Sequence, residues 1–214
     1  MKLYLSSYKF GDHPEELAKL FGKNKKVAVI TNALDFSTDI ERRKTSEQNQ
    51  IQQLIQLGLD PELLDLRDYF NNKRYIEEKL KSFGGVWVHG GNSFLLRVAY
   101  KLSGFDEIVK SYVNDADKKE FVYAGFSAGC CVLQKSLKGI EFVDDQTLTK
   151  SVYKIETIWE GVGIIDFVFV PHFESDHHES EVTNHEVEYY KKNNIKYKTL
   201  HDGEVLILNT DELN

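Results

Sequence analysis

The sequence is poor in cysteine, and its only two cysteines, Cys130 and Cys131, are neighbours. A disulfide between adjacent residues is strained, and this spacing matches no zinc motif. The cysteines therefore predict a reduced protein, which we expect in the cytoplasm. Proline is also scarce, with three in 214 residues, and no linker rich in Pro, Gly or Ser divides the chain. We expect one domain spanning residues 1–214, as a monomer or small homo-oligomer.

Long apolar runs and a surplus of positive charge are absent too. No run approaches the ~18 apolar residues that a membrane span needs, and the N-terminal residues show no signal-peptide pattern. The chain carries 27 Lys and Arg against 34 Asp and Glu, a formal net charge of −7. A nucleic-acid surface needs a clustered basic patch. The composition therefore predicts neither a membrane nor a nucleic-acid partner.

Short apolar runs alternate with segments of helical spacing along most of the chain. Runs buried on both faces are typical of a parallel sheet, and a glycine directly after a helical segment is typical of a helix end. The alternation predicts an α/β fold with helices on both sides of a mostly parallel sheet. The expected strands are 27–30, 86–88, 121–123 and 164–170, and the expected helices lie around 17–21, 51–55 and 76–83.

Two segments depart from this alternation. Residues 139–158 have scattered apolar positions without a helical face, which predicts an extended insertion or hairpin. Residues 197–208 contain two short strand-like runs around Asp202-Gly203, and an Asp-Gly pair suits a tight hairpin turn. We therefore expect a second hairpin near the end of the chain.

Residues 125–129 read Gly-Phe-Ser-Ala-Gly, between an apolar run and a helical pattern. A serine held on a sharp turn from strand to helix is a nucleophile in many hydrolases, and the flanking glycines allow the close backbone approach that the turn needs. Ser127 is therefore the candidate nucleophile. The N–H of Ala128, at the start of the helix, would stabilise negative charge on the reacting carbonyl oxygen.

An activated serine needs a base. His172 directly follows the most apolar strand-like run, and the ends of parallel strands are where α/β enzymes assemble their sites. The alternative is a histidine that only fills a corner. Residues 89–93 (His-Gly-Gly-Asn-Ser) form another junction of strand and helix, where Gly91 could supply a second N–H to an oxyanion hole. These residues could equally form a tight turn, with Asn92 or Ser93 as the helix N-cap.

These motifs resemble the dipeptidase E (aspartyl dipeptidase) family of serine peptidases, which is related to cyanophycinase. The resemblance rests on residues 90–94, the Gly-x-Ser-Ala-Gly at 125–129, Pro-His-Phe at 171–173 and a late Leu-x-Asp-Gly at 200–203. It implies a three-layer αβα sandwich like class I glutamine amidotransferase domains, with a serine in place of the cysteine. It further implies Ser127 as nucleophile, His172 as base and a carboxylate near position 202 to orient the base.

Asp202 stands where the dipeptidases have Glu, one methylene longer. Glu204 would point to the same side of an extended strand and is the reserve candidate for the orienting acid. The alternative for Asp202 is turn chemistry alone.

The segment after Phe173 contains six carboxylates and no Lys or Arg before Lys191. A substrate carboxylate would be unfavourable among these charges, so the sequence argues against a preference for N-terminal Asp. Glu174 could instead bind the free α-amino group of a peptide, while Asn92 and Arg97 could reach the site from the helix near residue 92. Most of the acidic residues would lie on the exposed face of a helix from about 178 to 191.

A metal site is the alternative for some of these residues. Glu174, Asp176, His177, His178 and His185 are ligand types, but no His-Glu-x-x-His motif is present and serine chemistry needs no metal. We predict no metal and no cofactor.

The sequence therefore predicts a serine peptidase that hydrolyses small peptides through an acyl-enzyme. One alternative is a small-ester hydrolase of the α/β-hydrolase type, but that fold places its acid before its histidine, which is not the order here. Another is a binding module in which the serine turn survives only as structure.

Overall fold

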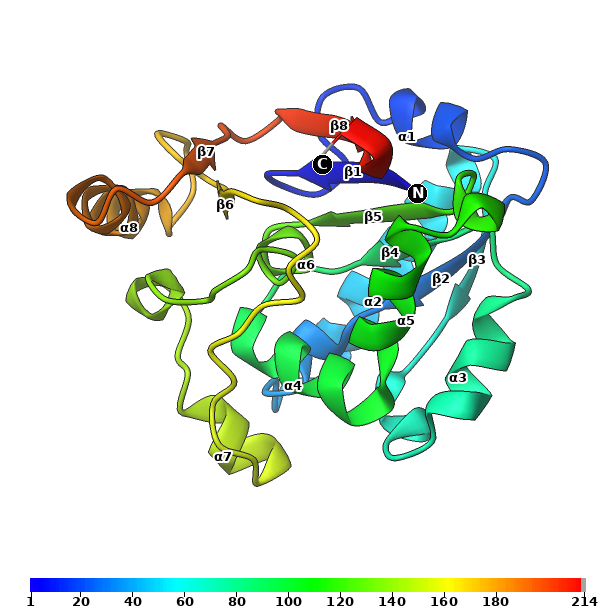
Figure 1. Ribbon diagram of the computed structural model, residues 1–214, viewed down its shortest axis with the longest axis horizontal. Helices are drawn as coiled ribbons and strands as arrows, with labels where there is room; N and C mark the ends of the chain where they lie inside the picture. The colour runs from blue at the N-terminus through cyan, green and yellow to red at the C-terminus, as the bar shows by residue number, and fades with distance from the viewer. Residues whose placement is uncertain (213–214) are drawn as a thin grey trace.

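The computed structural model of the chain describes residues 1–212 and has a six-stranded β-sheet at its centre (Figure 1). The strand order is β3-β2-β4-β5-β1-β8. Strands β1 to β5 run parallel, and β8 pairs antiparallel with β1 at one edge. The six strands are β1 (Lys2–Ser6), β2 (Lys26–Ile30), β3 (Asp60–Leu63), β4 (Gly85–Val88), β5 (Val122–Phe126) and β8 (Val205–Asn209).

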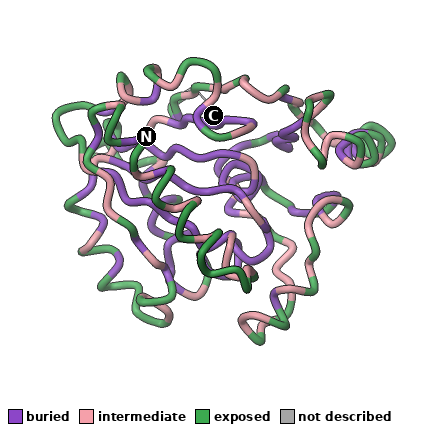
Figure 2. The backbone as a smooth tube through the Cα atoms, turned by 180° about the vertical axis from the view of Figure 1, so that it is seen from behind, coloured by how far each residue is buried: buried purple, intermediate pink, exposed green. Residues whose placement is uncertain are grey.

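Helices cover both faces of this sheet. Alternate side chains of a strand point to opposite faces, so Val86 and Val88 of β4 join one core and Trp87 joins the other. The first core is completed by α3 (Lys73–Leu80), α4 (Ser93–Ser103), α5 (Phe105–Val113) and α6 (Ala128–Cys131), and the second by α1 (Glu15–Leu20) and α2 (Ile40–Gln56). Figure 2 shows the central strands buried between exposed outer layers. The predicted three-layer αβα sandwich is confirmed.

A smaller unit lies beside the end of β5 and carries α8, at the left of Figure 1. Strands β6 (Val168–Val170) and β7 (Tyr197–Thr199) pair in parallel, and α8 (Ser180–Lys192) connects them. Val168, Val170, Val187 and Tyr190 form their own apolar cluster. The helix predicted at 178–191 is therefore present with slightly shifted ends. Short helices complete the chain: η1 (Asn32–Leu34), η2 (Leu66–Tyr69), η3 (Ala116–Lys118), η4 (Ile140–Phe142), α7 (Leu148–Tyr153) and η5 (Thr210–Glu212).

The hairpin predicted at 197–208 is wrong. Residues 139–158, predicted as an extended insertion or hairpin, contain η4 and α7, and Ile140 packs into the main core. Residues 197–208 contain β7 and β8, but β7 pairs with β6 and β8 pairs with β1, so the Asp202-Gly203 turn joins two different sheets. A sequence pattern identifies an extended segment but not the partner that its backbone finds, which depends on long-range packing.

Within the described residues, no helix combines the length and the apolar character that crossing a membrane requires. Cys130 and Cys131 are both free thiols, and both are buried.

Candidate active site

Ser127 occupies the sharp turn between β5 and α6. Its φ of 48° lies in the left-handed region, which a side chain rarely adopts and which is typical of a strained nucleophile turn. A Cβ on Gly125 or Gly129 would lie 2.9 or 2.6 Å from the carbonyl oxygen of Val88, so only glycine lets β5 and α6 pack this closely on β4. The motif therefore has the strand-turn-helix geometry that its sequence predicts.

His172 follows β6 and is almost fully buried, with 2% of its surface exposed. Its backbone also lies in the left-handed region, with a φ of 59°. The imidazole Nδ1 lies 2.7 Å from Oδ1 of Asp202. With the Nδ1–H donated to this carboxylate, Nε2 is left as the free basic nitrogen.

Serine side chains hold this pair from two sides. The backbone N–H of His172 donates to Oγ of Ser7 at 2.8 Å, and the Ser7 hydroxyl lies 3.0 Å from Oδ1 of Asp202. The backbone N–H of Asp202 donates to Oγ of Ser175 at 2.7 Å. Ser7 directly follows β1, so the main sheet fixes the position of the pair. No sequence pattern singled out Ser7 or Ser175 for this role.

Glu204, the reserve acid, lies elsewhere. Its Oε2 accepts a hydrogen bond from the N–H of His201 at 2.7 Å, and its side chain is exposed. It therefore stabilises the turn between β7 and β8. Of the two candidates, only Asp202 contacts the imidazole.

Aromatic rings enclose His172. The ring of His177 stacks on it, with centroids 3.8 Å apart and planes 9° from parallel, and Tyr8 meets it edge-on at 5.8 Å. Burial lowers the pKa of His172 below its usual 6.5, against the opposite effect of Asp202. Burial also lowers the pKa of His177 to about 4, with the nearby His172 and His178 adding to the shift. Both imidazoles are therefore neutral at pH 7, as a general base must be.

Ser127 and His172 line one cleft of about 560 Å³. Other residues that line it include Gly91, Arg42, Arg43 and Glu179. Within the described residues, Ser127 and His172 share no direct hydrogen bond. Such contacts are often long without substrate and tighten when substrate binds.

Two backbone N–H groups suit an oxyanion hole. Gly91 lines the cleft, and Ala128 begins the helix after Ser127. Over residues 1–212, neither N–H donates to an acceptor within the chain. The side chain of Asn92 accepts from the N–H of Leu95, and its Nδ2 donates to the carbonyl of Asp145. Asn92 is therefore the N-cap of α4, and its expected contact with substrate is replaced by this structural role.

Arg97 and Glu174, which were expected to contact the substrate, both lie where they cannot reach the cleft. Arg97 is buried, with its guanidinium 2.9 Å from Asp106 and bonded to the carbonyl of Glu160, so it joins α4 to its neighbours. Glu174 is exposed and does not line the cleft. The carboxylate beside the base is Glu179, whose Oε2 lies 3.8 Å from Nε2 of His172.

Among the described residues, one set could be considered for a metal. His172, His177 and Glu179 each place one ligand atom within 4.8 Å of the others. A metal ion lies in the plane of a ligating imidazole, however, and two parallel stacked rings cannot both point at one ion. Nδ1 of His177 also accepts the N–H of Glu179 at 3.2 Å. The set is therefore poorly shaped for one ion.

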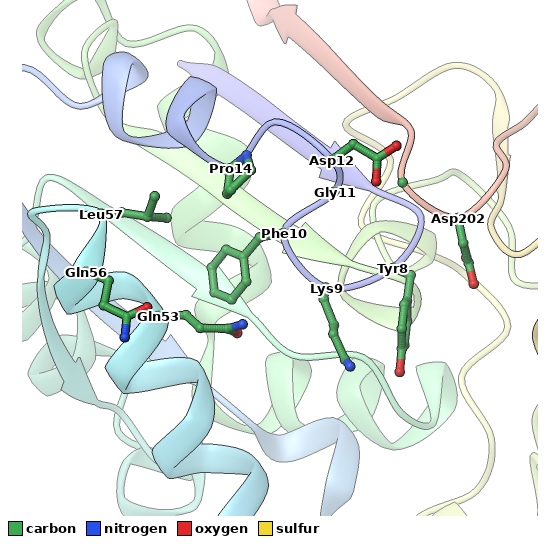
Figure 3. Close-up of a pocket in the computed structure, with 11 residues that line it drawn as sticks. Tyr8, Lys9, Phe10, Gly11, Asp12, Pro14, Gln53, Gln56, Leu57 and Asp202 are labelled. Carbon is green, nitrogen blue, oxygen red and sulfur yellow. The ribbon is translucent and has the colours of Figure 1, made fainter.

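A second cavity of about 450 Å³ lies along the loop that follows β1 (Figure 3). Tyr8 and Asp202 lie at its edge, and the picture shows their side chains pointing the same way, past the loop. Its remaining walls come from the loop, from α2 and its C-cap, including Gln53, Gln56 and Leu57, and from Gly203. It contains neither Ser127 nor His172, so we place the chemistry in the other cleft.

Glu186 of α8 has a carboxyl buried to 4% exposure near this site. Burial, then repulsion from Asp144, Glu179 and Glu141, raises its pKa to about 8, and only the hydrogen bond from Tyr190 opposes this. The Glu186 carboxyl is therefore mostly protonated and neutral at pH 7. Burial also raises the pKa of the neighbouring Cys131 thiol, which is neutral too.

We expect Glu186→Gln to stabilise the protein relative to wild type as the pH rises. The unfolded carboxyl ionises near pH 4.5 and the folded one near 8, so wild-type stability falls between these values while the variant has no such loss. The expected gain at pH 9 is several degrees in Tm, since each kcal/mol corresponds to about 2–4 °C at this size. Thermal unfolding from pH 5 to 9 measures it, with the exposed Glu188→Gln as control. A pH-independent difference would contradict the assignment.

The whole chain matches a known family. Residues 5–214 match the model of peptidase family S51, so the chain belongs to that family. The expected serine-type peptidase is thereby confirmed at the level of the family, as is the resemblance to dipeptidase E.

Individual relatives are more distant. An uncharacterized peptidase, Lmo0363 of Listeria monocytogenes serovar 1/2a, is 29% identical over 120 residues, which cover 56% of this chain and about half (54%) of that protein. A Listeria monocytogenes EGD-e protein provisionally described as a peptidase E has a crystal structure similar to this one, with a TM-score of 0.69, 22% identity and coverage of 97% and 98%. A peptidase from an acI-B1 Actinobacterium has a TM-score of 0.68 at 17% identity, covering 97% of this chain and 83% of that one.

Proposed function

We propose that this protein hydrolyses small peptides through an acyl-enzyme, with Ser127 as nucleophile, His172 as base and Asp202 as the acid that orients the base. The observation that carries the proposal is the 2.7 Å pairing of a buried, neutral histidine with Asp202, in the cleft that also contains the strained Ser127. This combination makes a histidine with a fixed tautomer available to a serine.

In the proposed reaction, Nε2 of His172 takes the proton of the Ser127 hydroxyl as Oγ attacks the scissile carbonyl. The N–H groups of Gly91 and Ala128 stabilise the oxyanion. His172 then gives its proton to the leaving amine, which leaves an acyl-Ser127. Water, deprotonated by the same imidazole, releases the acid and restores the serine. Asp202 stabilises the imidazolium in both steps.

The charges of the cleft favour short, free peptides as substrates. Arg42 and Arg43 lie among its walls, and Glu179 lies beside the base. Arg43 is paired with Asp35 and Glu47, whereas Arg42 is exposed. A free dipeptide carries a positive and a negative end only a few bonds apart, which matches this arrangement. The two free thiols support the proposed location in the reducing cytoplasm.

The test combines two measurements on the purified protein. We expect a fluorophosphonate to label Ser127 and a panel of dipeptides to be hydrolysed, with no loss of rate in EDTA. Labelling without peptide hydrolysis, but with hydrolysis of a simple ester, would indicate the small-ester hydrolase. The absence of both labelling and hydrolysis would indicate the binding module.

A further inference from the structure

A second buried histidine lies in the cleft beside Ser127. His89 directly follows β4 and lines the same cleft as Ser127 and His172. Its ring packs on Phe126, the residue before the nucleophile, with the ring centroids 4.8 Å apart. The reaction proposed above does not use this imidazole. A buried titratable group so close to the nucleophile is a candidate for a role in the chemistry.

Both ring nitrogens of His89 have a partner. Nδ1 lies 2.7 Å from the carbonyl oxygen of Gly90, and Nε2 lies 2.9 Å from Oγ of Ser46 on α2. A carbonyl oxygen can only accept, so Nδ1 carries the proton and Nε2 accepts from the Ser46 hydroxyl. Burial lowers the pKa of His89, which agrees with a neutral ring. Because neither nitrogen is free, His89 is unsuited to take a proton from Ser127.

The bond to Gly90 fixes the direction of one peptide group. The carbonyl of Gly90 and the N–H of Gly91 belong to the same peptide unit, and no peptide bond in residues 1–212 is cis. In a planar trans peptide the C=O and the N–H point in opposite directions. Holding the carbonyl against His89 therefore also sets where the Gly91 N–H points. This N–H has no acceptor within the described residues, and Gly91 is partly exposed in the cleft, so the N–H is available to an oxyanion.

The two glycines are required by close packing beside the nucleophile. A Cβ on Gly90 would lie 3.1 Å from Cβ of Ser127, and a Cβ on Gly91 would lie 2.6 Å from the carbonyl oxygen of Ala33. Glycines on both sides, however, leave the peptide between them free to adopt more than one orientation. A half-turn of this peptide would place a carbonyl oxygen where the N–H should be, and that oxygen would repel the oxyanion.

The backbone on either side is already held. The N–H of His89 donates to the carbonyl of Ile30, and the N–H of Asn92 donates to the carbonyl of Ala33, both at 2.9 Å. Over residues 1–212, the bond from the His89 ring is the only hydrogen bond that the peptide between Gly90 and Gly91 makes. The choice between its two orientations therefore depends on this side chain.

We propose that His89 is a positioning residue of the oxyanion hole, whose Nδ1–H holds the peptide between Gly90 and Gly91 with the Gly91 N–H toward the substrate oxygen. The inference rests on the proposed function and adds a residue to the same site. Ser46 contributes by donating to Nε2, which keeps the proton of the ring on Nδ1. Full negative charge forms on the substrate oxygen only during reaction, so the effect of His89 belongs to the transition state.

The experiment compares two substitutions of His89. His89→Phe keeps an aromatic ring against Phe126 but removes the donor. His89→Asn places an amide nitrogen as many bonds from Cα as Nδ1 and so restores a donor. We expect His89→Phe to lower kcat about 10- to 100-fold with little change in KM, somewhat less than the outright loss of an oxyanion-hole donor, and His89→Asn to recover most of this loss. His89→Ala replaces His89→Phe if that variant does not fold. His13→Phe, at an exposed histidine before α1, is the control and should keep the wild-type kcat.

Two further measurements separate positioning from a general loss of structure. The aldehyde analogue of the best dipeptide forms an adduct with Ser127 whose oxygen occupies the oxyanion hole. Its affinity should fall in His89→Phe by the same factor as kcat/KM and recover in His89→Asn, since transition-state analogues report the same interactions. Crystal structures of the wild type and His89→Phe show the orientation of the peptide without any turnover, and we expect it to be reversed or mixed only in the variant.

An unchanged kcat in His89→Phe would overturn the inference. Equal losses in His89→Phe and His89→Asn, a loss carried by KM alone, or the same peptide orientation in wild type and His89→Phe would overturn it as well. A wild-type protein that hydrolyses no peptide, but whose peptide reverses in His89→Phe, would instead count against the proposed function alone.

Discussion

Ser127→Ala is expected to abolish peptide hydrolysis and fluorophosphonate labelling and to leave the fold intact. Loss of the nucleophile of a serine triad lowers kcat by a factor on the order of 10⁶, since the base and the orienting acid have nothing left to activate. The fold should tolerate the change, because over residues 1–212 the Ser127 side chain makes no hydrogen bond and alanine is smaller. Steady-state kinetics on the best dipeptide of the panel measures the loss.

The matched control is Ser111→Ala on α5, where an exposed serine bonds only to the carbonyl of Ile108. It should retain full activity, and circular dichroism and Tm should be unchanged in both variants. Retention of more than a few per cent of activity by Ser127→Ala would place the nucleophile elsewhere in the cleft.

The geometry around Ser127 could be predicted because its causes are local. A buried strand, two glycines and a helix start within eight residues leave few other backbone paths. The position of His172 was predictable for a related reason, since it follows a strongly apolar strand and strand ends collect functional groups. The sheet and its two helical layers followed from the alternation of apolar runs and helical segments.

The rest depends on contacts between distant segments. Ser7 and Asp202 are 195 residues apart and meet only because the residues that follow β1 and β7 lie side by side. Glu179 was one of six acidic residues after Phe173, and only its place at the start of α8 brings it to His172. Arg97 was a plausible ligand for a carboxylate until packing gave it Asp106, 9 residues away on α5. Residue type predicted these possibilities, but the partner was decided by the fold.

Asp202→Asn is expected to lower kcat by a factor on the order of 10² to 10⁴. Asparagine has almost the same shape, but Ser7 and His172 both contact Oδ1 of Asp202, so an amide nitrogen in that position would donate to Nδ1 of His172 and could no longer accept from Ser7. The proton of the imidazole would then lie on Nε2, and a protonated Nε2 cannot take the serine proton. Without the carboxylate, the imidazolium that forms during attack also loses its stabilising charge. Because these losses affect the transition state, KM should change much less than kcat.

Glu204→Gln is the matched control, since it makes the same change two residues away, where the carboxylate contacts only the turn at His201. It should retain nearly all of the activity. The pH dependence of kcat/KM gives a second readout: its acidic limb in wild type should lie below pH 6.5, because burial lowers the pKa of His172, and it should move lower still without Asp202, which raises that pKa. The reverse ranking of the two variants would make Glu204 the orienting acid. If neither variant loses activity, His172 and Ser127 act as a dyad that needs no third residue.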